Sequence, residues 1–311
     1  MNLPSISLVT PSYNQGSTIQ ETIESVLGQD YPGLEYFVAD GGSKDETVAI
    51  LQSYGEQFQW VSEPDRGQSH AINKGWGRSQ GEIIAWLNSD DLLAPGALPA
   101  VGRFFAEHPE IDGLYGDCDY IDGSGEWLSA YPTEPFDYPK LVASTINYLP
   151  QPASFLRRRV LETAGGVDEA LHYVMDFDLW LRAGLQHSFA YLPVRLASLR
   201  VYGAAKSVAG LDRMGDELVQ IYRAYFQRPD LPVEIRALQS KALGMIYQRA
   251  ADCHFWAGKL GSARRLAWKA WQSNPLCFHK LWFYLLLGPA GRRMAERRSG
   301  NPYLLRPRVN E

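Results

Sequence analysis

Short apolar runs alternate with helical patterns along the first third of this chain, and this alternation constrains the fold more than any other feature. The apolar runs cover residues 5–10, 34–39, 59–62 and 82–87. Between them, apolar residues recur at helical spacing. Ser17 and Gln20 resemble a capping box, which predicts where the first helix opens. The alternation predicts an α/β fold with a parallel, doubly wound sheet, whose ligands bind at the carboxyl ends of the strands.

The pattern changes after residue 112. Alternating apolar and polar residues around Asp122-Gly123-Ser124-Gly125 predict a hairpin over 112–131. A further strand is predicted at 153–157 and a buried helix at 175–183, so we expect the sheet to become mixed. From about residue 208 the pattern is helical. We therefore expect a catalytic or binding domain over 1–207 and a helical, basic C-terminal region over 208–311.

Composition excludes several classes of protein. The chain has 311 residues, 45% of them hydrophobic, which is enough for a large core and argues against disorder. Cys118, Cys253 and Cys277 are far apart, so neither a disulfide framework nor a zinc ribbon is expected, and a reducing compartment is indicated. The N-terminal residues lack the pattern of a signal peptide, and the apolar run at 281–287 is too short to span a membrane. These features predict a cytoplasmic protein.

Positive charge is concentrated at the C-terminal end. From residue 254 onward the chain carries eleven Lys and Arg against two Glu, although its net charge is −5. The aromatic residues interleaved with this charge are Trp268, Trp271, Phe278, Trp282 and Phe283. Such a pattern is typical of a helix that lies on an anionic membrane surface. A helical bundle that packs its aromatics and solvates its arginines explains it equally well. No nucleic-acid-binding motif accompanies the charge, so we expect no nucleic-acid partner.

Polar side chains gather where the predicted elements end. They are Asn14, Asp40, Asp90 with Asp91, and Asp176 with Asp178. A nucleoside diphosphate needs such groups: an acceptor for its base, a carboxylate for a divalent cation at the diphosphate, and a base that activates the nucleophile. Ordinary alternatives exist for the single pieces. Gly41-Gly42 fits a common turn, and Asp90-Asp91 fits a cap for the next helix.

Four segments, in this order, resemble the family 2 glycosyltransferases. They are TPSYNQGSTIQETIESVLGQDYPGLEYFVADGGSKDET (10–47), SEPDRGQSHAINKG (62–75), EIIAWLNSDDLLAPGAL (82–98) and GGVDEALHYVMDFDLWLRAG (165–184). The resemblance covers roughly the first 205 residues, and four ordered motifs are far more specific than one. It implies the GT-A fold, a Rossmann-like doubly wound mixed sheet, and inverting transfer of a sugar from a nucleotide-sugar donor.

The resemblance also implies roles for single residues. The residues that match donor-binding positions are Pro11, Tyr13, Asn14, Asp40, Gly41, Arg66, Gln68, Asn73, Asn88, Asp90, Asp91 and Lys206. Asp40 matches the carboxylate that accepts a hydrogen bond from the imide of the base, which implies a pyrimidine, as in a UDP- or dTDP-sugar. Arg66 is implied at the diphosphate, although a solvated surface arginine is the alternative.

Metal binding and proton removal are assigned in the same way. Asn88-Ser89-Asp90 stands in place of the family's Asp-x-Asp motif, so Asp90 is the implied ligand of Mn²⁺ or Mg²⁺. One carboxylate suffices when diphosphate oxygens and waters complete the coordination. Asp176 matches the general base that removes the proton of the acceptor hydroxyl; a carboxylate placed to favour a helix dipole is the alternative. Asp178 is expected to pair with Arg182, four residues on.

Two departures from the family pattern leave a second hypothesis open. Asn88 replaces an Asp, and Tyr202 stands where members of the family often have a His that binds metal or diphosphate. A catalytically silent protein that binds nucleotide sugars or glycans would tolerate both. His70 and His172 are assigned supporting polar roles, because the resemblance places the base elsewhere. A dinucleotide oxidoreductase or a nucleotidyltransferase is disfavoured, because neither a GxGxxG motif nor a lysine-bearing phosphate loop follows the first strand.

The resemblance favours an active transferase that uses a glycan or lipid-linked acceptor in cell-surface polysaccharide or O-antigen synthesis. Such an enzyme is expected in the cytoplasm, peripherally on the cytoplasmic face of the membrane. The sequence does not identify the sugar, the acceptor, the linkage or the oligomeric state.

Overall fold

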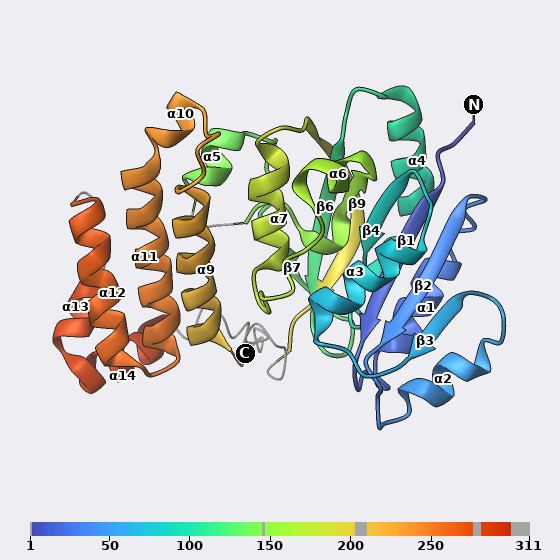
Figure 1. Cartoon of the computed structure of the whole chain (residues 1–311). Helices are drawn as coiled ribbons and strands as arrows, with labels where there is room; N and C mark the ends of the chain where they lie inside the picture. The colour runs from blue at the N-terminus through green and yellow to red at the C-terminus, as the bar shows by residue number, and fades with distance from the viewer. Residues whose placement is uncertain (1, 145–146, 203–209, 276–280, 300–311) are drawn as a thin grey trace. The chain divides into compact units, whose positions relative to one another are not determined.

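The computed structural model describes residues 2–144, 147–202, 210–275 and 281–299 (Figure 1). The chain forms two compact units. One comprises residues 1–136 and 148–200, and the other comprises residues 137–147 and 201–311. The helical unit thus includes the segment 137–147 besides the C-terminal residues. A domain boundary after residue 207 stays a prediction, since residues 203–209 lie outside the described ranges.

The first unit is built on one mixed sheet. In the described chain its strands are β1 (Ile6–Ser12), β2 (Leu34–Asp40), β3 (Gln59–Ser62), β4 (Ile83–Trp86), β5 (Leu92–Leu93), β6 (Gly113–Ile121), β7 (Trp127–Ala130), β8 (Ser154–Arg157) and β9 (Phe189–Arg200). Their order is β3-β2-β1-β4-β8-β6-β9-β5, and β7 pairs with β6. The first four strands are parallel, whereas β8 runs antiparallel to both β4 and β6. The predictions of a mixed α/β sheet and of a β6–β7 hairpin are confirmed.

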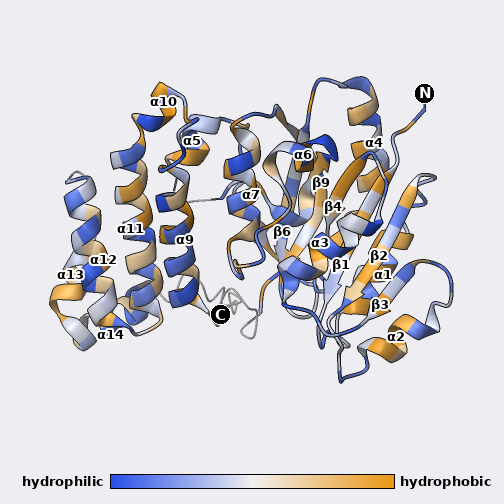
Figure 2. Cartoon of the chain, viewed as in Figure 1, coloured by the Kyte–Doolittle hydropathy of each residue, from blue (hydrophilic) through white to orange (hydrophobic). Residues whose placement is uncertain are grey.

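Helices cover both faces of this sheet (Figure 1). They are α1 (Ile19–Leu27), α2 (Thr47–Ser53), α3 (Gln68–Arg78), α4 (Ala97–Glu107), α6 (Arg159–Ala164) and α7 (Met175–Gly184), with a short 3₁₀ turn η1 (Gln151–Ala153). Ile6 and Leu8 of β1 share a buried cluster with α1, α2 and α4. On the opposite face α3 approaches β1 so closely that a Cβ on Gly75 would lie 2.5 Å from Val9. The central strands accordingly carry hydrophobic residues (Figure 2).

The start of α1 differs from the sequence prediction. The helix begins at Ile19, and no side-chain hydrogen bond caps its first turn, so the predicted Ser17–Gln20 capping box is wrong. Thr18, which precedes the helix, donates its hydroxyl to the carbonyl of Ser89 at 2.9 Å. A contact with a distant loop therefore replaces the local cap.

The second unit is helical in its described residues. Its helices are α5 (Tyr138–Val142), α9 (Leu211–Tyr225), α10 (Val233–Arg236), α11 (Gln239–Trp256), α12 (Leu260–Ser273), α13 (Leu281–Leu286) and α14 (Gly288–Ser299). Phe255 of α11 and the small Ala263 and Ala267 of α12 form a core with Leu281 and Leu285 of α13. None of the helices in the described ranges is both long and apolar enough to cross a bilayer.

Candidate active site

Strands β1, β2 and β3 end at the same level, and Asp40 at the end of β2 lies between the ends of the other two. The register pairs Ser12 with Asp40 and Asp40 with Ser62. The fully buried Asp40 carboxylate accepts hydrogen bonds from the backbone N–H of Gly42 at 3.1 Å, from that of Ser43 at 2.9 Å, and from the hydroxyls of Ser43 and Ser62. These donors fix the carboxylate in a single orientation. Ser43 and Ser62 support the site, and no sequence pattern had singled them out.

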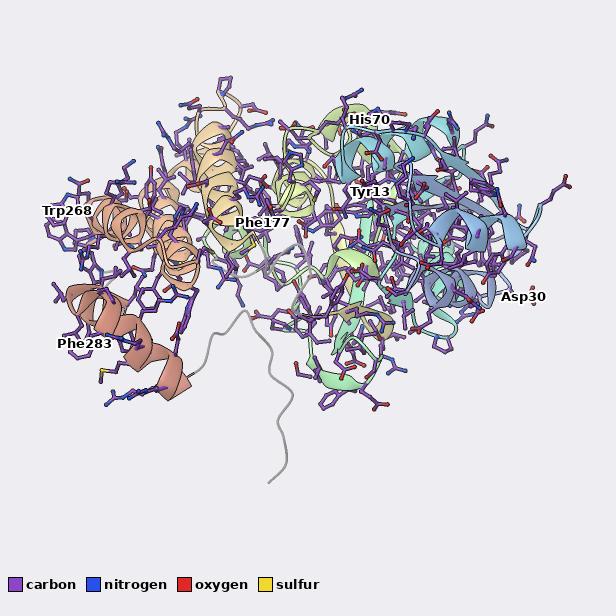
Figure 3. The ribbon with its side chains drawn as sticks, turned by 90° about the horizontal axis from the view of Figure 1, so that it is seen from below. Tyr13, Asp30, His70, Phe177, Trp268 and Phe283 are labelled. Atoms are coloured by element: carbon purple, nitrogen blue, oxygen red, sulfur yellow. The ribbon has the colours of Figure 1, made fainter. Side chains whose placement is uncertain are left out.

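The loop after β1 is tied to the loop after β2. Asn14 adopts a left-handed conformation with φ of 52°. Its backbone N–H donates to Ser43 Oγ at 2.7 Å, and its side-chain Oδ1 accepts from the N–H of Lys44 at 2.8 Å. The adjacent Tyr13 ring is 59% exposed at this edge (Figure 3). An aromatic face and a rigid carboxylate therefore lie on neighbouring loops, an arrangement suited to stacking and reading a base.

Two other predicted donor-binding residues, Pro11 and Gly41, are explained by the backbone around them. Pro11 is buried within β1, opposite Ala39. Gly41 donates its N–H to the carbonyl of Ser12, and a Cβ at this position would lie 2.9 Å from the Asp65 carboxylate. A larger residue at this position would collide with Asp65, so glycine is required here. Direct contacts of these two residues with a donor stay predictions.

Asn88 is the centre of a network of side-chain amides beside the Asp90 loop. Its Nδ2 donates to Asp91 Oδ2 at 3.1 Å and to Gln151 Oε1 at 3.0 Å, and its Oδ1 accepts from Gln68 Nε2 at 2.6 Å. The amide oxygen and nitrogen are therefore both engaged within the protein. Gln151 was not predicted from the sequence, and it closes the network by donating to the carbonyl of Trp86.

Asp91 and Asp90 have different environments. Asp91 is buried, and its carboxylate accepts from the backbone N–H of Arg200 at 2.9 Å. Burial and the neighbouring charge of Asp90 raise the pKa of Asp91 well above its ordinary value. Helix α4 begins only at Ala97, so this pair does not cap it. Asp90 is half-buried, so it is the less buried residue of the two.

The donor set at Asp90 fits a metal ion that arrives with a diphosphate. Among the described residues, no group of three or more His, Cys, Asp or Glu side chains could hold a metal by itself. Mg²⁺ bound to nucleotides commonly uses one or two carboxylates, with phosphate oxygens and waters as its other ligands. Asp90 alone meets that requirement.

The start of α3 holds the segment that leads into α7. Asn73 uses both ends of its amide on this segment: Nδ2 donates to the carbonyl of Val167 at 2.9 Å, and Oδ1 accepts from the N–H of Val167 at 3.1 Å. Ser69 donates its hydroxyl to the carbonyl of Leu171. The exposed Arg66 forms an ion pair with Glu169. Asn73 and Arg66 therefore contact the 165–174 segment in this structure, and their contacts with a donor stay predictions.

Helix α7 carries Asp176 and packs against β4. Asp176 is half-buried in the first turn, directly after the segment that α3 holds. One turn later, Trp180 stacks on Trp86 of β4 with ring centroids 5.9 Å apart, and Trp86 precedes Asn88 by two residues. Asp178 forms an ion pair with Arg182 at 2.7 Å, which confirms the predicted pair.

The remaining predicted residues are less informative. His70 lies on α3 with Nδ1 3.5 Å from the N–H of Arg66, and His172 packs against Gly67. Tyr202 is half-buried just after β9. Lys206 lies outside the described residues.

The structure brings Asn14, Asp40, Gln68, Asn88 and Asp90 to one edge of the sheet, and the start of α7 is tied to α3 beside them.

Comparison with known proteins identifies the family. The family model described as "Glycosyl transferase family 2" matches residues 7–165. An uncharacterized glycosyltransferase of Rickettsia prowazekii is 26% identical over 231 residues, which cover 72% of this chain and 72% of the relative. An uncharacterized glycosyltransferase of Mycobacterium tuberculosis is 31% identical over 186 residues, which cover 58% of this chain and 70% of the relative.

Solved structures agree on the fold. Residues 1–349 of TarS from S. aureus, in complex with UDP-GlcNAc, align with a TM-score of 0.65 and 18% identity over 96% of this chain and 91% of that one. The mannosyltransferase PcManGT from Pyrobaculum calidifontis, in complex with GDP-Man and Mn²⁺, aligns with a TM-score of 0.60 and 20% identity over 96% and 88%. The strand-end loops described above lie within the matched family region. This chain is a family 2 glycosyltransferase with the GT-A fold.

Proposed function

We propose that the chain transfers a sugar from a UDP- or dTDP-sugar to a hydroxyl of a glycan or lipid-linked acceptor, with inversion at the anomeric carbon. The observation that supports this proposal is that β1, β2 and β4 run parallel, so that Asp40 and the Asp90 loop follow strands that end at one edge of the sheet, while Ser69 of α3 holds the segment before α7. TarS was solved in complex with UDP-GlcNAc and PcManGT in complex with GDP-Man, which supports a nucleoside-diphosphate sugar as the donor. Synthesis of a cell-surface polysaccharide or O-antigen is the process we propose.

The donor is held by the strand-end loops. Asp40, which is fully buried in this structure and bound to Ser43, Ser62 and the turn, is the proposed acceptor of the imide N–H of a pyrimidine through the lone pair that remains on Oδ1. Tyr13 covers the base. Asp90 would hold Mn²⁺ or Mg²⁺, and such an ion would supply positive charge at the diphosphate. The complex of PcManGT with Mn²⁺ supports this assignment.

Asp176 acts as the general base. Its carboxylate takes the proton from the acceptor hydroxyl as that oxygen forms a bond to the anomeric carbon. The bond from the anomeric carbon to the diphosphate oxygen breaks in the same step, and the nucleoside diphosphate leaves with the electron pair. One in-line displacement inverts the configuration, so no covalent enzyme intermediate forms. Positioning by the loop that α3 holds contributes to the rate by fixing the base.

The test is release of nucleoside diphosphate from a panel of UDP-, dTDP- and GDP-sugars with Mn²⁺ and a glycolipid acceptor extract. Asp176→Asn is expected to lower kcat by roughly 10²- to 10⁴-fold, as loss of a general base does, while thermal stabilisation by the donor persists. Asp178→Asn is the matched control. It removes a carboxylate from the same helix, and that carboxylate pairs with Arg182. Equal activity of the two variants would contradict the role of Asp176. Donor binding without release by the wild type would support the silent binding protein instead.

We also propose that the second unit lies on the anionic cytoplasmic surface of the membrane. Trp268 and Trp271 of α12 are 52% and 41% exposed and stack with centroids 4.9 Å apart. Phe283 and Leu286 of α13 are also exposed, and Trp268 and Phe283 project from their helices in Figure 3. In the described part of 260–298, seven Lys and Arg accompany one acidic residue, Glu296. Exposed aromatics beside basic side chains favour the interface of an anionic bilayer.

Co-sedimentation with vesicles tests the membrane proposal. Full-length protein is expected to pellet with vesicles of phosphatidylcholine and phosphatidylglycerol, and to pellet less with phosphatidylcholine alone. The double variant Trp268→Ser/Trp271→Ser should lose most of this binding. Trp127→Ser serves as the control, because Trp127 is even more exposed, at 63%, but lies on β7 of the first unit. Binding that neither depends on anionic lipid nor falls in the double variant would favour a packing role for these helices.

A further inference from the structure

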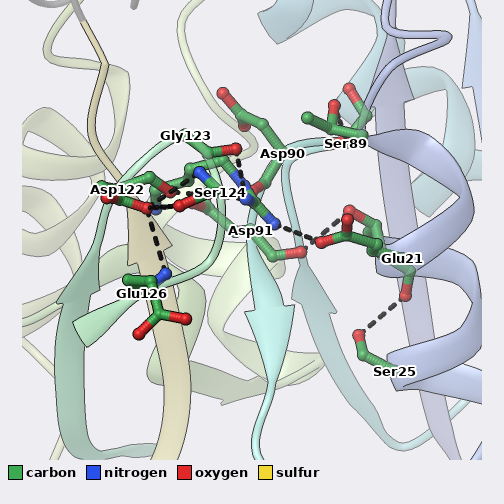
Figure 4. Close-up of polar contacts among 12 residues, drawn as sticks. Glu21, Ser25, Ser89, Asp90, Asp91, Asp122, Gly123, Ser124 and Glu126 are labelled. Atoms are coloured by element: carbon green, nitrogen blue, oxygen red, sulfur yellow. Dashed lines mark hydrogen bonds and ion pairs between the residues drawn. The ribbon is translucent and has the colours of Figure 1, made fainter.

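A buried arginine lies at the end of β9, beside the Asp90 loop. The Arg200 side chain is 1% exposed. Its guanidinium donates to the carbonyl of Asp90 at 2.9 Å, to that of Gly123 at 3.0 Å, and to the carboxylate of Glu21 at 2.6 Å (Figure 4). Burying a guanidinium is costly unless its donors are satisfied. Here the partners come from three separate segments: the Asp90 loop, the β6–β7 turn and α1.

Arg200 completes a set of donors that fixes the Asp90 loop. Three consecutive carbonyls of this loop accept a side-chain hydrogen bond. Thr18 donates to Ser89 at 2.9 Å, Arg200 donates to Asp90, and Thr22 donates to Asp91 at 2.9 Å. The backbone on both sides of Asp90 is therefore held by α1 and the residue before it, while the backbone at Asp90 itself depends on Arg200.

We propose that Arg200 is a positioning residue for the Asp90 carboxylate. This inference rests on the proposed metal-binding role of Asp90. Arg200 holds the carbonyl of the residue whose side chain binds the ion, and thereby fixes the direction in which the carboxylate points. The positive charge of Arg200 also lies next to Asp90 and Asp91. This charge stabilises the ionised form of the two neighbouring carboxylates. Residues that orient a metal ligand typically change metal affinity by about 10- to 100-fold when they are lost.

A second buried arginine provides a matched control. Arg157 at the end of β8 donates to the carbonyls of Ile111 at 2.8 Å and Phe105 at 2.7 Å, and it pairs with Glu82. It is therefore bonded as Arg200 is, to backbone carbonyls and one carboxylate. Glu82 precedes β4 and Ile111 precedes β6, at the opposite end of these strands from Asp90, and Phe105 belongs to α4. Loss of Arg157 reports the cost of removing a buried arginine without touching the Asp90 loop.

The experiment compares Arg200→Met, Arg200→Lys, Arg157→Met and Asp90→Asn in the full-length protein. Mn²⁺ binding is measured by electron paramagnetic resonance with Mn²⁺ alone and with Mn²⁺ plus UDP, at a temperature where every variant is folded by circular dichroism. The Mn²⁺ dependence of diphosphate release is measured in parallel. Arg200→Met is expected to weaken Mn²⁺ binding in the presence of UDP by about tenfold or more. Arg200→Lys keeps the charge and should lose less, and Arg157→Met should bind Mn²⁺ as the wild type does.

The outcomes separate this inference from the proposed function. If Asp90→Asn weakens Mn²⁺ binding but Arg200→Met and Arg200→Lys do not, Arg200 is merely structural and the inference is overturned. The same conclusion holds if Arg157→Met weakens Mn²⁺ binding as much as Arg200→Met does. If Asp90→Asn itself leaves Mn²⁺ binding and the metal dependence unchanged, the metal role of Asp90 fails, and the inference fails with it. Should Arg200→Met not fold, the comparison of Arg200→Lys with Arg157→Lys decides.

Discussion

Replacing Asn88 with Asp restores the carboxylate of the family's Asp-x-Asp motif, yet the structure predicts that this change destabilises the protein. The Asn88 amide donates to Asp91 and to Gln151. A carboxylate has no hydrogen to donate, so both acceptors lose their partner. It also brings a second negative charge to within 3.1 Å of a buried carboxylate oxygen.

The magnitude follows from these two effects. Two lost hydrogen bonds cost about 1 kcal/mol each. Two unit charges 3.1 Å apart repel by about 5 kcal/mol at an effective dielectric constant of about 20. Because Asn88 is only half-buried, we take about half of this repulsion. The expected loss is about 4.5 kcal/mol of the free energy of unfolding at pH 7.5.

The loss should depend on pH. Burial and the charge of Asp90 already raise the pKa of Asp91, and a second carboxylate raises the pKa of the pair further. The folded pair then keeps a proton that the unfolded chain has released, so stability falls as pH rises between the unfolded and folded pKa values. As pH falls through the folded pKa the pair takes up a proton, and the loss should shrink towards the value of about 2 kcal/mol that comes from the hydrogen bonds.

Urea denaturation at pH 5 and pH 7.5, followed by tryptophan fluorescence, measures this difference. Asn88→Ala is the control, because it removes the hydrogen bonds without adding charge, and its loss should change less between the two pH values than the loss in Asn88→Asp. If Asn88→Asp is as stable as the wild type at pH 7.5, the amide network does not have the role that we assign to it. A pH-independent loss would refute the charge argument alone.

Two further predictions concern the core and an ion pair. Trp180→Ala should lower the free energy of unfolding by about 3–5 kcal/mol, because it removes the ring that stacks on Trp86. Denaturant titration against the wild type measures this loss, and a value below about 1 kcal/mol would contradict the prediction. Burial opposes ionisation of Asp112, but hydrogen bonds from Arg159 and His187 outweigh it and lower its pKa. The stabilisation by Asp112 is therefore present above its unfolded-state pKa and lost as pH falls through the lower folded value. Asp112→Asn should melt below the wild type at pH 7 and approach it near pH 3, and a constant difference in Tm would refute this.

Local patterns in the sequence determined most of the first unit. Buried strands need continuous apolar runs and helices need apolar residues at their own spacing, so β1 to β4 and α7 could be predicted within a few residues. Parallel strands that end together bring their following loops to one edge, so Asp40 and Asp90 could be assigned to a common site. The pair Asp178–Arg182 followed from helical geometry alone.

Only the tertiary structure decided which partner each polar group finds. Thr18 lies where a capping residue would be expected, yet its hydroxyl is bound to Ser89, 71 residues away. Arg200 meets Asp90 across 110 residues, and Asn88 meets Gln151 across 63. A hydroxyl, amide or guanidinium can bond to many groups, and the sequence records its donors and acceptors but not the neighbour that packing brings within 3 Å. For this reason the residues that could bind a donor were readable from the chain, whereas the residues that orient them emerged only from the fold.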